Sequence, residues 1–186
     1  MIVVSRSPMP SRVKTPASLR IGHGYDLHRL EPKAPPGRGR PFILGGVTLD
    51  HPKGPVSHSD GDAVYHAVVD AIFGALGQPD IGQQFPDTDP VYKGVSSAKF
   101  VTAAREAISR ASFEIQTLDI TVICEQPKLA PVKAQMISNI AHLLQVGIDR
   151  VNLKAKTHED VDAVGEGRAV EVHAVVLLAL VSSGTA

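Results

Sequence analysis

The chain is poor in cysteine and has no excess of either charge. Cys124 is the one cysteine among 186 residues, so no disulfide can form within the chain, which favours a reducing compartment. Because Cys124 ends an apolar stretch, a buried structural thiol is favoured over a nucleophile. The 19 Lys and Arg residues balance 19 Asp and Glu residues, which gives no support for a nucleic-acid or membrane-surface partner. Any recognition of phosphate must therefore be local.

A run of about 18 apolar residues, which a membrane-spanning helix needs, is also absent. The longest candidate, 169–181, is interrupted by Glu171 and His173 and is better interpreted as a strand. Hydrophobic residues make up 43% of the chain, enough for the core of one domain, expected over 20–182. Residues 1–19 contain bases, Ser and Pro but no acid, and are interpreted as a disordered tail or the remnant of an organelle transit peptide.

Apolar periodicity and turn residues divide the domain into strands and helices. The pattern predicts strands at 20–30, 41–49, 113–124, 151–157 and 169–180, and helices at 59–76, 96–111 and 132–144. Ser59 is the expected cap of the first helix, and the first two strands are placed to pair as an N-terminal hairpin. The order indicates an α+β fold: a small mixed four-stranded sheet with helices on one face, plus that hairpin. The apolar last strand suggests that a subunit partner covers the other face.

Asp26, His28 and His66 form a candidate metal site. Side chains at i and i+2 of a strand share one face, so Asp26 and His28 can converge, and His66 lies on the following helix. Two imidazoles and one carboxylate suit Zn²⁺, and three protein ligands leave the fourth position open, as in catalytic zinc sites. Spacing alone does not decide, because Asp-x-His pairs are common and a helix histidine is more often a surface or core residue.

Several separate motifs follow one another in a fixed order. They are Arg20-Ile21-Gly22-His23-Gly24-Tyr25-Asp26-Leu27-His28, Leu44-Gly45-Gly46-Val47, His58-Ser59-Asp60-Gly61-Asp62, His66, Asp80-Ile81-Gly82, and Phe85-Pro86-Asp87-Thr88-Asp89-Pro90 with Lys93-Gly94. With them, the chain resembles the 2-C-methyl-D-erythritol 2,4-cyclodiphosphate synthase family of the non-mevalonate isoprenoid pathway, over about 20–180. The sequence of residues 151–159 is closer to that of plastid-type members.

This resemblance implies a homotrimeric enzyme, a phosphorus–oxygen lyase, with active sites between adjacent subunits. The substrate would be 4-diphosphocytidyl-2-C-methyl-D-erythritol 2-phosphate, and the products would be the cyclic diphosphate and CMP. Asp26, His28 and His66 would ligate zinc, and Glu159 would help to hold a second divalent ion, Mg²⁺ or Mn²⁺. Together with the basic N-terminus, the resemblance implies a plastid location, chloroplast or apicoplast, with the cytoplasm as the alternative.

The resemblance also implies which residues contact the substrate. His58 and Thr157 would be catalytic, stabilising the transferring phosphoryl group. The substrate-binding residues would be Asp26, His28, His58, Ser59, Asp80, Ile81, Gly82, Phe85, Pro86, Asp87, Thr88, Asp89, Lys93, Cys124, Glu125, Gln126, Pro127, Lys128, Leu129, Ala130, Lys156, Thr157, His158 and Glu159. Residues 124–130 would form the cytosine pocket, and 85–89 a flexible substrate loop.

Plainer interpretations remain open for several of these residues. Asp80 alone could cap a helix, 86–90 could be an ordinary turn, and 156–160 could be a solvated strand end. The same three metal ligands would also serve a zinc phosphohydrolase acting on a nucleotide, which would release inorganic phosphate. A trimer in which zinc only joins strand to helix is a further alternative; phosphate bound directly to the metal would exclude it.

Overall fold

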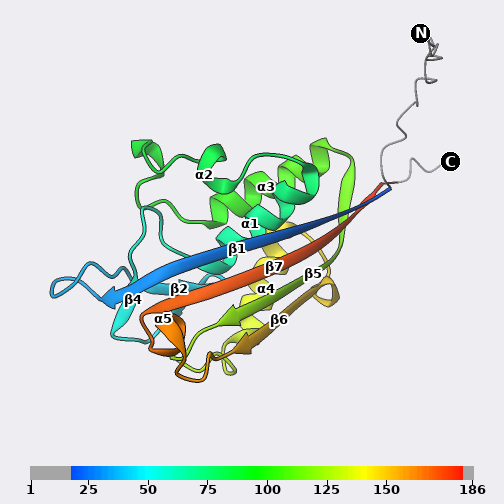
Figure 1. Cartoon of the computed structure of the whole chain (residues 1–186). Helices are drawn as coiled ribbons and strands as arrows, with labels where there is room; N and C mark the ends of the chain where they lie inside the picture. The colour runs from blue at the N-terminus through cyan, green and yellow to red at the C-terminus, as the bar shows by residue number, and fades with distance from the viewer. Residues whose placement is uncertain (1–17, 182–186) are drawn as a thin grey trace, which may run out of the picture.

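The computed structural model describes residues 18–181, which form an α+β fold (Figure 1). The expected tail, 1–19, lies almost wholly outside these residues. The elements are β1 (Leu19–Pro32), β2 (Phe42–Leu44), β3 (Val47–Leu49), β4 (Lys53–Pro55), α1 (Ala63–Leu76), α2 (Ile81–Gln84), α3 (Ala98–Arg110), β5 (Phe113–Ile123), α4 (Lys133–Leu144), β6 (Val151–Lys156), α5 (Asp162–Gly165) and β7 (Ala169–Leu180), with 3-10 turns at Pro90–Tyr92 and Ile148–Arg150. Every predicted helix and strand has a counterpart, although several begin or end elsewhere.

The main sheet is mixed, but the predicted number of strands and the predicted hairpin are wrong. Among the described residues this sheet has five strands in the order β4-β1-β7-β5-β6, and only β5 and β6 run parallel. Strand β1 pairs along its length with β7, not with 41–49. Gly45 and Gly46, with φ of 55° and 72°, instead turn 41–49 back on itself as the separate β2–β3 hairpin. Glycine suits this turn because left-handed backbone angles cost it little.

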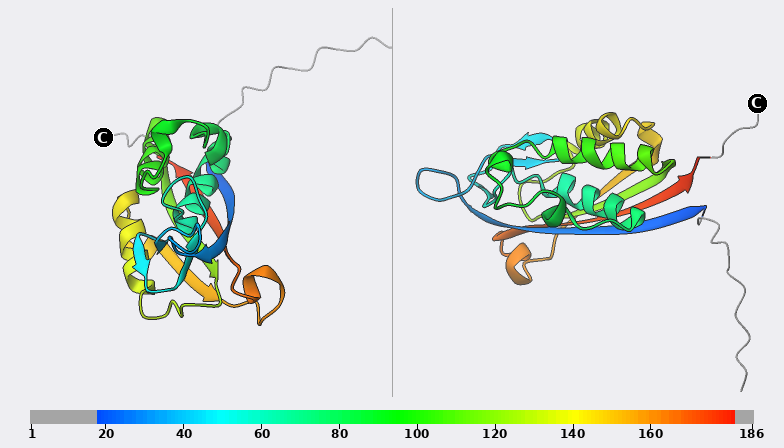
Figure 2. Two further views of the ribbon diagram at one scale, coloured as in Figure 1. Left: turned by 90° about the vertical axis from the view of Figure 1, so that its left-hand side faces the viewer. Right: turned by 90° about the horizontal axis from the view of Figure 1, so that it is seen from above.

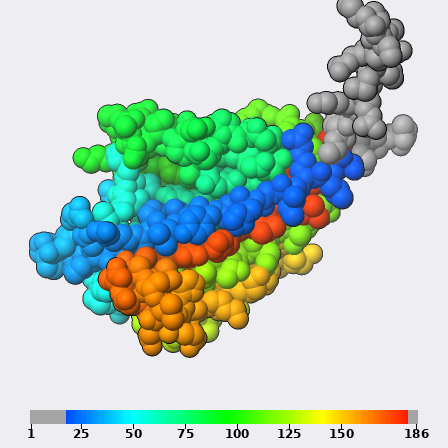
Figure 3. All heavy atoms as spheres, viewed as in Figure 1, coloured from blue at the N-terminus to red at the C-terminus, as the bar shows by residue number. Residues whose placement is uncertain are grey.

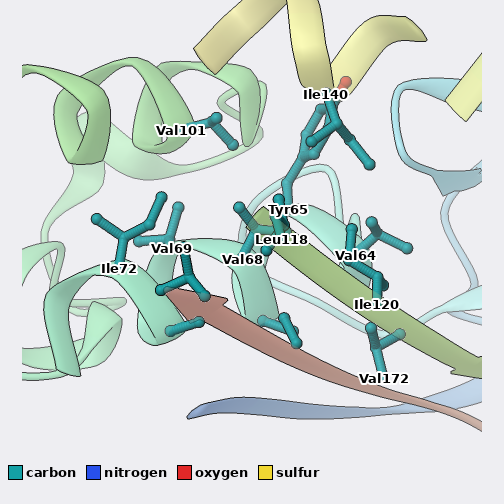
Figure 4. Packing of buried hydrophobic residues seen from close by; sticks show 14 of the residues in the cluster. Val64, Tyr65, Val68, Val69, Ile72, Val101, Leu118, Ile120, Ile140 and Val172 are labelled. Atoms are coloured by element: carbon teal, nitrogen blue, oxygen red, sulfur yellow. The ribbon is translucent and has the colours of Figure 1, made fainter. Parts of the chain in front are cut away.

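Helices α1, α3 and α4 cover one face of the sheet, as predicted, whereas the short α5 lies on the other side (Figure 2). Between these helices and the sheet, apolar side chains of α1 such as Val64, Val68 and Ile72 belong to one core with Leu118 and Ile120 of β5 (Figure 4). All five of these side chains are fully buried. The core therefore fixes α1 against the sheet, and α1 carries His66.

Helix α1 begins at Ala63 and is capped by Asp62, so the prediction that Ser59 caps it is wrong. The Asp62 carboxylate accepts hydrogen bonds from the backbone N–H groups of Val64 and Tyr65, and also from those of Gly45 and Gly46 at 2.9 and 2.7 Å. Burial raises the pKa of Asp62 to about 6, although these hydrogen bonds act in the opposite direction. One buried carboxylate thus joins the start of α1 to the β2–β3 turn.

At Gly22 and Gly24, strand β1 lies against the backbone of α1 with no side chain of the strand in between. A Cβ atom at Gly22 would lie 1.9 Å from the carbonyl oxygen of Ala71, and one at Gly24 would lie 1.9 Å from that of Ala67. Alternate residues of a strand share one face, so Asp26 and His28 continue the row of Gly22 and Gly24 toward the helix. This close approach brings the Asp26–His28 pair to the first turns of α1.

The opposite face of β1 and β7 is open in the single chain. Atoms of the two strands lie side by side on the surface (Figure 3). Ile21 is 71% exposed there, and Tyr25, Leu27 and Val175 are also exposed. An open apolar sheet face of this kind marks an interaction surface. Within residues 18–181, none of the helices combines the length and the apolar character that crossing a bilayer requires.

Replacing Gly24 with alanine should destabilise the protein, because the new methyl group would overlap the backbone of α1. Overpacking of this kind costs about 1–3 kcal/mol or more, measured as the free energy of unfolding in urea. Gly74→Ala is the matched control, since a Cβ there meets only His23 O at 3.8 Å. That substitution should be neutral or stabilise α1 by up to about 1 kcal/mol. Equal effects of the two variants would contradict the close contact.

Candidate metal centre and substrate pocket

Asp26, His28 and His66 converge at one point between β1 and α1. Asp26 Oδ2 lies 3.1 Å from His66 Nδ1 and 3.3 Å from His28 Nδ1. One ligand atom from each residue lies within 4.8 Å of the others, the only such group of three among the residues that the structure describes. The sequence prediction that these three side chains meet is therefore confirmed.

This arrangement fits a divalent metal ion. Ligand atoms at about 2.0–2.2 Å from a tetrahedral ion lie about 3.3–3.6 Å apart, near the observed distances of 3.1 and 3.3 Å. His28 Nδ1 is buried and has no hydrogen-bond partner within 18–181, an arrangement that is costly unless something else satisfies the nitrogen. A cation bound by the three residues would supply that partner.

The two imidazoles experience different electrostatic environments. Burial lowers the pKa of His28, and the charge of Asp26 offsets this only in part. For His66 burial also lowers the pKa, but the hydrogen bond to Asp26 and the charges of Asp26, Asp62 and Asp60 outweigh it, so the net pKa is raised. The local field is therefore negative around His66, as a cation site requires.

The three residues open onto a pocket of about 460 Å³. Its lining consists of Asp26, His28, Ser57, His58, Ser59, His66, Ile81, Gly82, Phe85, Asp87, Tyr92 and Phe100. Eight of the predicted site residues line this pocket besides His66, and a larger hollow of about 570 Å³ near α3 and α4 contains none. The chemistry is therefore expected in the smaller pocket.

His58 and Ser59 stand at the wall of the pocket, on the segment that leads into α1. His58 Nε2 is buried without a hydrogen-bond partner among the described residues. The His58 carbonyl accepts from Gly94 N at 2.8 Å and from Arg40 Nη2 at 3.3 Å, which holds the segment in place. The wall of the pocket thus contains, at His58, one imidazole nitrogen that the described residues leave without a hydrogen bond.

The predicted substrate loop lies over an aromatic cluster. Phe85 stacks on Phe100 with ring centroids 4.6 Å apart and contacts Tyr92 edge-on at 5.6 Å. Pro86, Thr88, Asp89 and Lys93 are exposed and do not line the pocket. Tyr92 and Phe100 were not predicted as pocket residues, because an aromatic residue in a loop or helix start gives no sign of where it points.

Asp80 does what the plainer interpretation proposed, since its carboxylate caps α2 by accepting from Gln83 N at 2.9 Å. It faces a different, smaller hollow than Ile81 and Gly82 do. Any contact of Asp80 with a substrate would need a ligand that extends beyond the pocket.

The remaining predicted residues form a second group at the carboxyl ends of β5 and β6. Cys124 N donates to Lys156 O at 3.0 Å, His158 N donates to Glu125 Oε1 at 2.6 Å, and Thr157 Oγ1 donates to Glu159 Oε1 at 2.6 Å. The structure thus brings 124–130 together with 156–159, but none of them lines the pocket at His66. Cys124 is buried and burial raises the pKa of its thiol to about 11, which favours a structural thiol over a nucleophile.

Comparison with known proteins finds one family. A family model described as the YgbB family matches residues 19–179. The chain is 52% identical to the chloroplastic 2-C-methyl-D-erythritol 2,4-cyclodiphosphate synthase of Arabidopsis thaliana over 159 residues, 86% of this chain and 66% of that protein. It is 45% identical to the 2-C-methyl-D-erythritol 2,4-cyclodiphosphate synthase of Pelobacter propionicus, covering 86% of this chain and 98% of that protein.

A solved structure has the same fold. IspF of Plasmodium falciparum, in complex with CDP, superposes with a TM-score of 0.76 at 37% identity, covering 88% of this chain and 97% of that chain. The chain thus spans about two thirds of the length of the Arabidopsis protein and nearly all of the other two.

Replacing His66 with alanine should abolish tight binding of Zn²⁺ while the fold survives, because one of three ligands is lost. Loss of a residue that only orients a metal ligand typically weakens metal binding by about 10- to 100-fold. Loss of the ligand His66 should weaken zinc binding by more than this, as measured by competition with a zinc-sensitive dye. His142→Ala, an exposed histidine of α4, is the matched control and should keep one Zn²⁺ per chain. Equal zinc affinity in both variants would show that the metal binds elsewhere.

Proposed function

Because the chain belongs to the YgbB family, its function is to form 2-C-methyl-D-erythritol 2,4-cyclodiphosphate, and we propose that the reaction takes place at the Asp26–His28–His66 centre. The substrate is 4-diphosphocytidyl-2-C-methyl-D-erythritol 2-phosphate, and CMP is released. The observation that carries the proposed location is the convergence of these three side chains at the mouth of one pocket.

The reaction is an intramolecular phosphoryl transfer, in class a phosphorus–oxygen lyase reaction. An oxygen of the 2-phosphate attacks the β-phosphorus, a new P–O bond forms, and the bond to the α-phosphate oxygen breaks as CMP takes the electron pair. No protein nucleophile is needed, because the attacking phosphate is already ionised. Two anions must be brought together, however, and at about 4 Å two unit charges repel by about 4 kcal/mol at an effective dielectric constant of about 20.

We assign the metal as zinc, which suits two imidazoles and one carboxylate and leaves a fourth position open. When bound, a zinc ion would withdraw charge from the β-phosphate and orient it. Asp26, His28 and His66 hold that ion between β1 and α1. His58 and Ser59 position the phosphates beside it, and the buried His58 Nε2 supports this role since it has no hydrogen-bond partner among the described residues.

The loop of 85–89 would act as a lid. Phe85 anchors its start by stacking on Phe100, while Asp87, Thr88 and Asp89 are exposed beyond it. A loop anchored by Phe85, with exposed side chains at its tip beside the pocket, is placed to close over a substrate. Closure excludes water, which would otherwise hydrolyse the diphosphate in competition with ring formation.

The second residue group would complete the site from an adjacent subunit of a homotrimer. Residues 124–130 would bind the cytosine, Lys156 and His158 would lie beside the diphosphate, and Thr157 would donate to a phosphoryl oxygen. Glu159 would help to hold Mg²⁺ or Mn²⁺, which would offset the negative charge of the diphosphate. Two features support this arrangement: the group does not line the pocket of its own chain, and the face of β1 and β7 is open and apolar.

The compartment that fits this chain is a plastid. Its plant relatives are named chloroplastic and are about half identical to it, and residues 1–19 contain bases but no acid. Residues 20–182 would then form the single catalytic domain.

The reaction is tested by incubating the protein with the cytidyl substrate, Zn²⁺ and Mg²⁺ and following the phosphorus NMR spectrum. The expected products are CMP and a cyclic diphosphate, whose two phosphorus signals are coupled. Inorganic phosphate in place of the cyclic product would identify a hydrolase and reject the synthase. A metal-free sample should be inactive, because the metal would supply most of the positive charge that offsets the charge of the β-phosphate.

The shared site is tested by mixing two inactive variants, His66→Ala and Glu159→Gln, under conditions that exchange subunits. If each site uses His66 of one subunit and Glu159 of the next, every mixed trimer contains one intact site. A random mixture has about three quarters mixed trimers, each with one intact site of three, so about one quarter of the wild-type activity should return. The matched mixture of His66→Ala with His28→Ala, two changes in the same half-site, should stay inactive. Equal recovery in both mixtures would contradict the split site.

A further inference from the structure

His66 is held from two sides, and the side away from the metal ligands leads to a buried chain of hydrogen bonds. His66 Nδ1 faces Asp26 Oδ2 at 3.1 Å. On the other side of the ring, His66 Nε2 lies 2.8 Å from the hydroxyl of Ser97, which is fully buried at the start of α3. The Ser97 hydroxyl in turn donates to Asp60 Oδ1, and Ser97 N donates to Asp60 Oδ2 at 2.9 Å.

The direction of these hydrogen bonds follows from which groups can donate and which can only accept. An ionised carboxylate can only accept, so the Ser97 hydroxyl donates its one proton to Asp60. The lone pairs of Ser97 Oγ are then left to accept, and the group placed to donate to them is His66 Nε2–H. A neutral imidazole carries one proton, so a proton at Nε2 leaves Nδ1 with a free lone pair.

We propose that Ser97 and Asp60 are positioning residues that fix the proton of His66 on Nε2 and so keep Nδ1 ready to bind the metal. Neither residue touches the ion; they act through the ring of His66. These hydrogen bonds oppose the other neutral form of the ring, in which the proton is on Nδ1. Asp26 would accept a hydrogen bond from that proton equally well when no metal is bound. Hydrogen bonds to the remote nitrogen of a ligating histidine orient the ring and strengthen it as a ligand in other metal sites. The inference rests on the metal centre proposed above.

Further contacts hold the Ser97–Asp60 pair in position beside His66. Asp60 Oδ1 also accepts from Asp62 N at 3.2 Å, which holds the carboxylate in place from the segment that enters α1. Ser59 Oγ lies farther from His66 Nε2, at 3.2 Å, and also accepts from Gly61 N. Ser97 is therefore the shorter and better placed acceptor, and it links α3 to α1 at the level of the metal site.

The main test reads the position of the proton without any metal or substrate. Nitrogen-15 NMR of the ring of His66, in metal-free protein at a pH where the ring is neutral, should show a protonated Nε2 and a bare Nδ1. In Ser97→Ala the proton should move to Nδ1, where Asp26 accepts it. A wild-type protein with the proton on Nδ1 would overturn the proposal, and this measurement depends on no variant folding correctly.

The affinity for Zn²⁺ supplies a second readout. Ser97→Ala should weaken zinc binding by about 10- to 100-fold, since the ring must first move its proton off Nδ1. Ser96→Ala is the matched control: Ser96 is the exposed neighbour, and its hydroxyl makes only a long contact of 3.4 Å with Ala98 N. Ser97→Thr, which keeps the hydroxyl, should restore both the Nε2 proton and the affinity.

These outcomes separate the inference from the proposed function. Equal zinc affinity and ring protonation in Ser97→Ala and Ser96→Ala would reject the role of Ser97 while leaving the synthase reaction intact. A protein that binds no zinc at all, but still has the proton on Nε2, would reject the metal centre and leave the hydrogen-bond chain as found.

Discussion

The close approach of β1 to α1 is the constraint on which the rest of the site depends. Gly22 and Gly24 let the strand lie directly on the helix backbone, since any side chain at these positions would overlap carbonyl oxygens of Ala67 and Ala71. The same row of the strand continues as Asp26 and His28. A wider separation would move both side chains away from His66 and would leave three isolated polar groups in place of a metal centre.

Around that contact, one buried carboxylate, Asp62, and two half-buried ones, Asp60 and Asp26, set the position of the helix and the hydrogen bonds of His66. Asp62 caps α1 and holds the Gly45–Gly46 turn, and Asp60 binds Ser97 at the start of α3. His66 lies between Asp26 on one side and the Ser97–Asp60 pair on the other. Since buried carboxylates are stable only when they are well hydrogen-bonded, these contacts tie the site to the core instead of leaving it on a loose surface loop.

In the single chain the candidate site residues fall into two separate groups. The pocket at His66 holds the candidate metal ligands and the candidate phosphate-binding residues, whereas 124–130 and 156–159 gather at the ends of β5 and β6. An open apolar sheet face lies along β1 and β7. Assembly of copies through that face would bury apolar surface and would also join the two half-sites, so that stability and activity would depend on the same contact.

The sequence by itself determined the α+β class, the main helices and strands, and the three residues that converge, because periodicity and motifs are local or are shared with a family. It did not determine that β1 pairs with β7, that 41–49 forms its own hairpin, or that Asp62 caps α1 in place of Ser59. Nor did it reveal Ser97, Tyr92 and Phe100 beside the site. These depend on contacts between residues far apart in the chain, and only the tertiary structure decides which polar or aromatic side chain is buried against which partner.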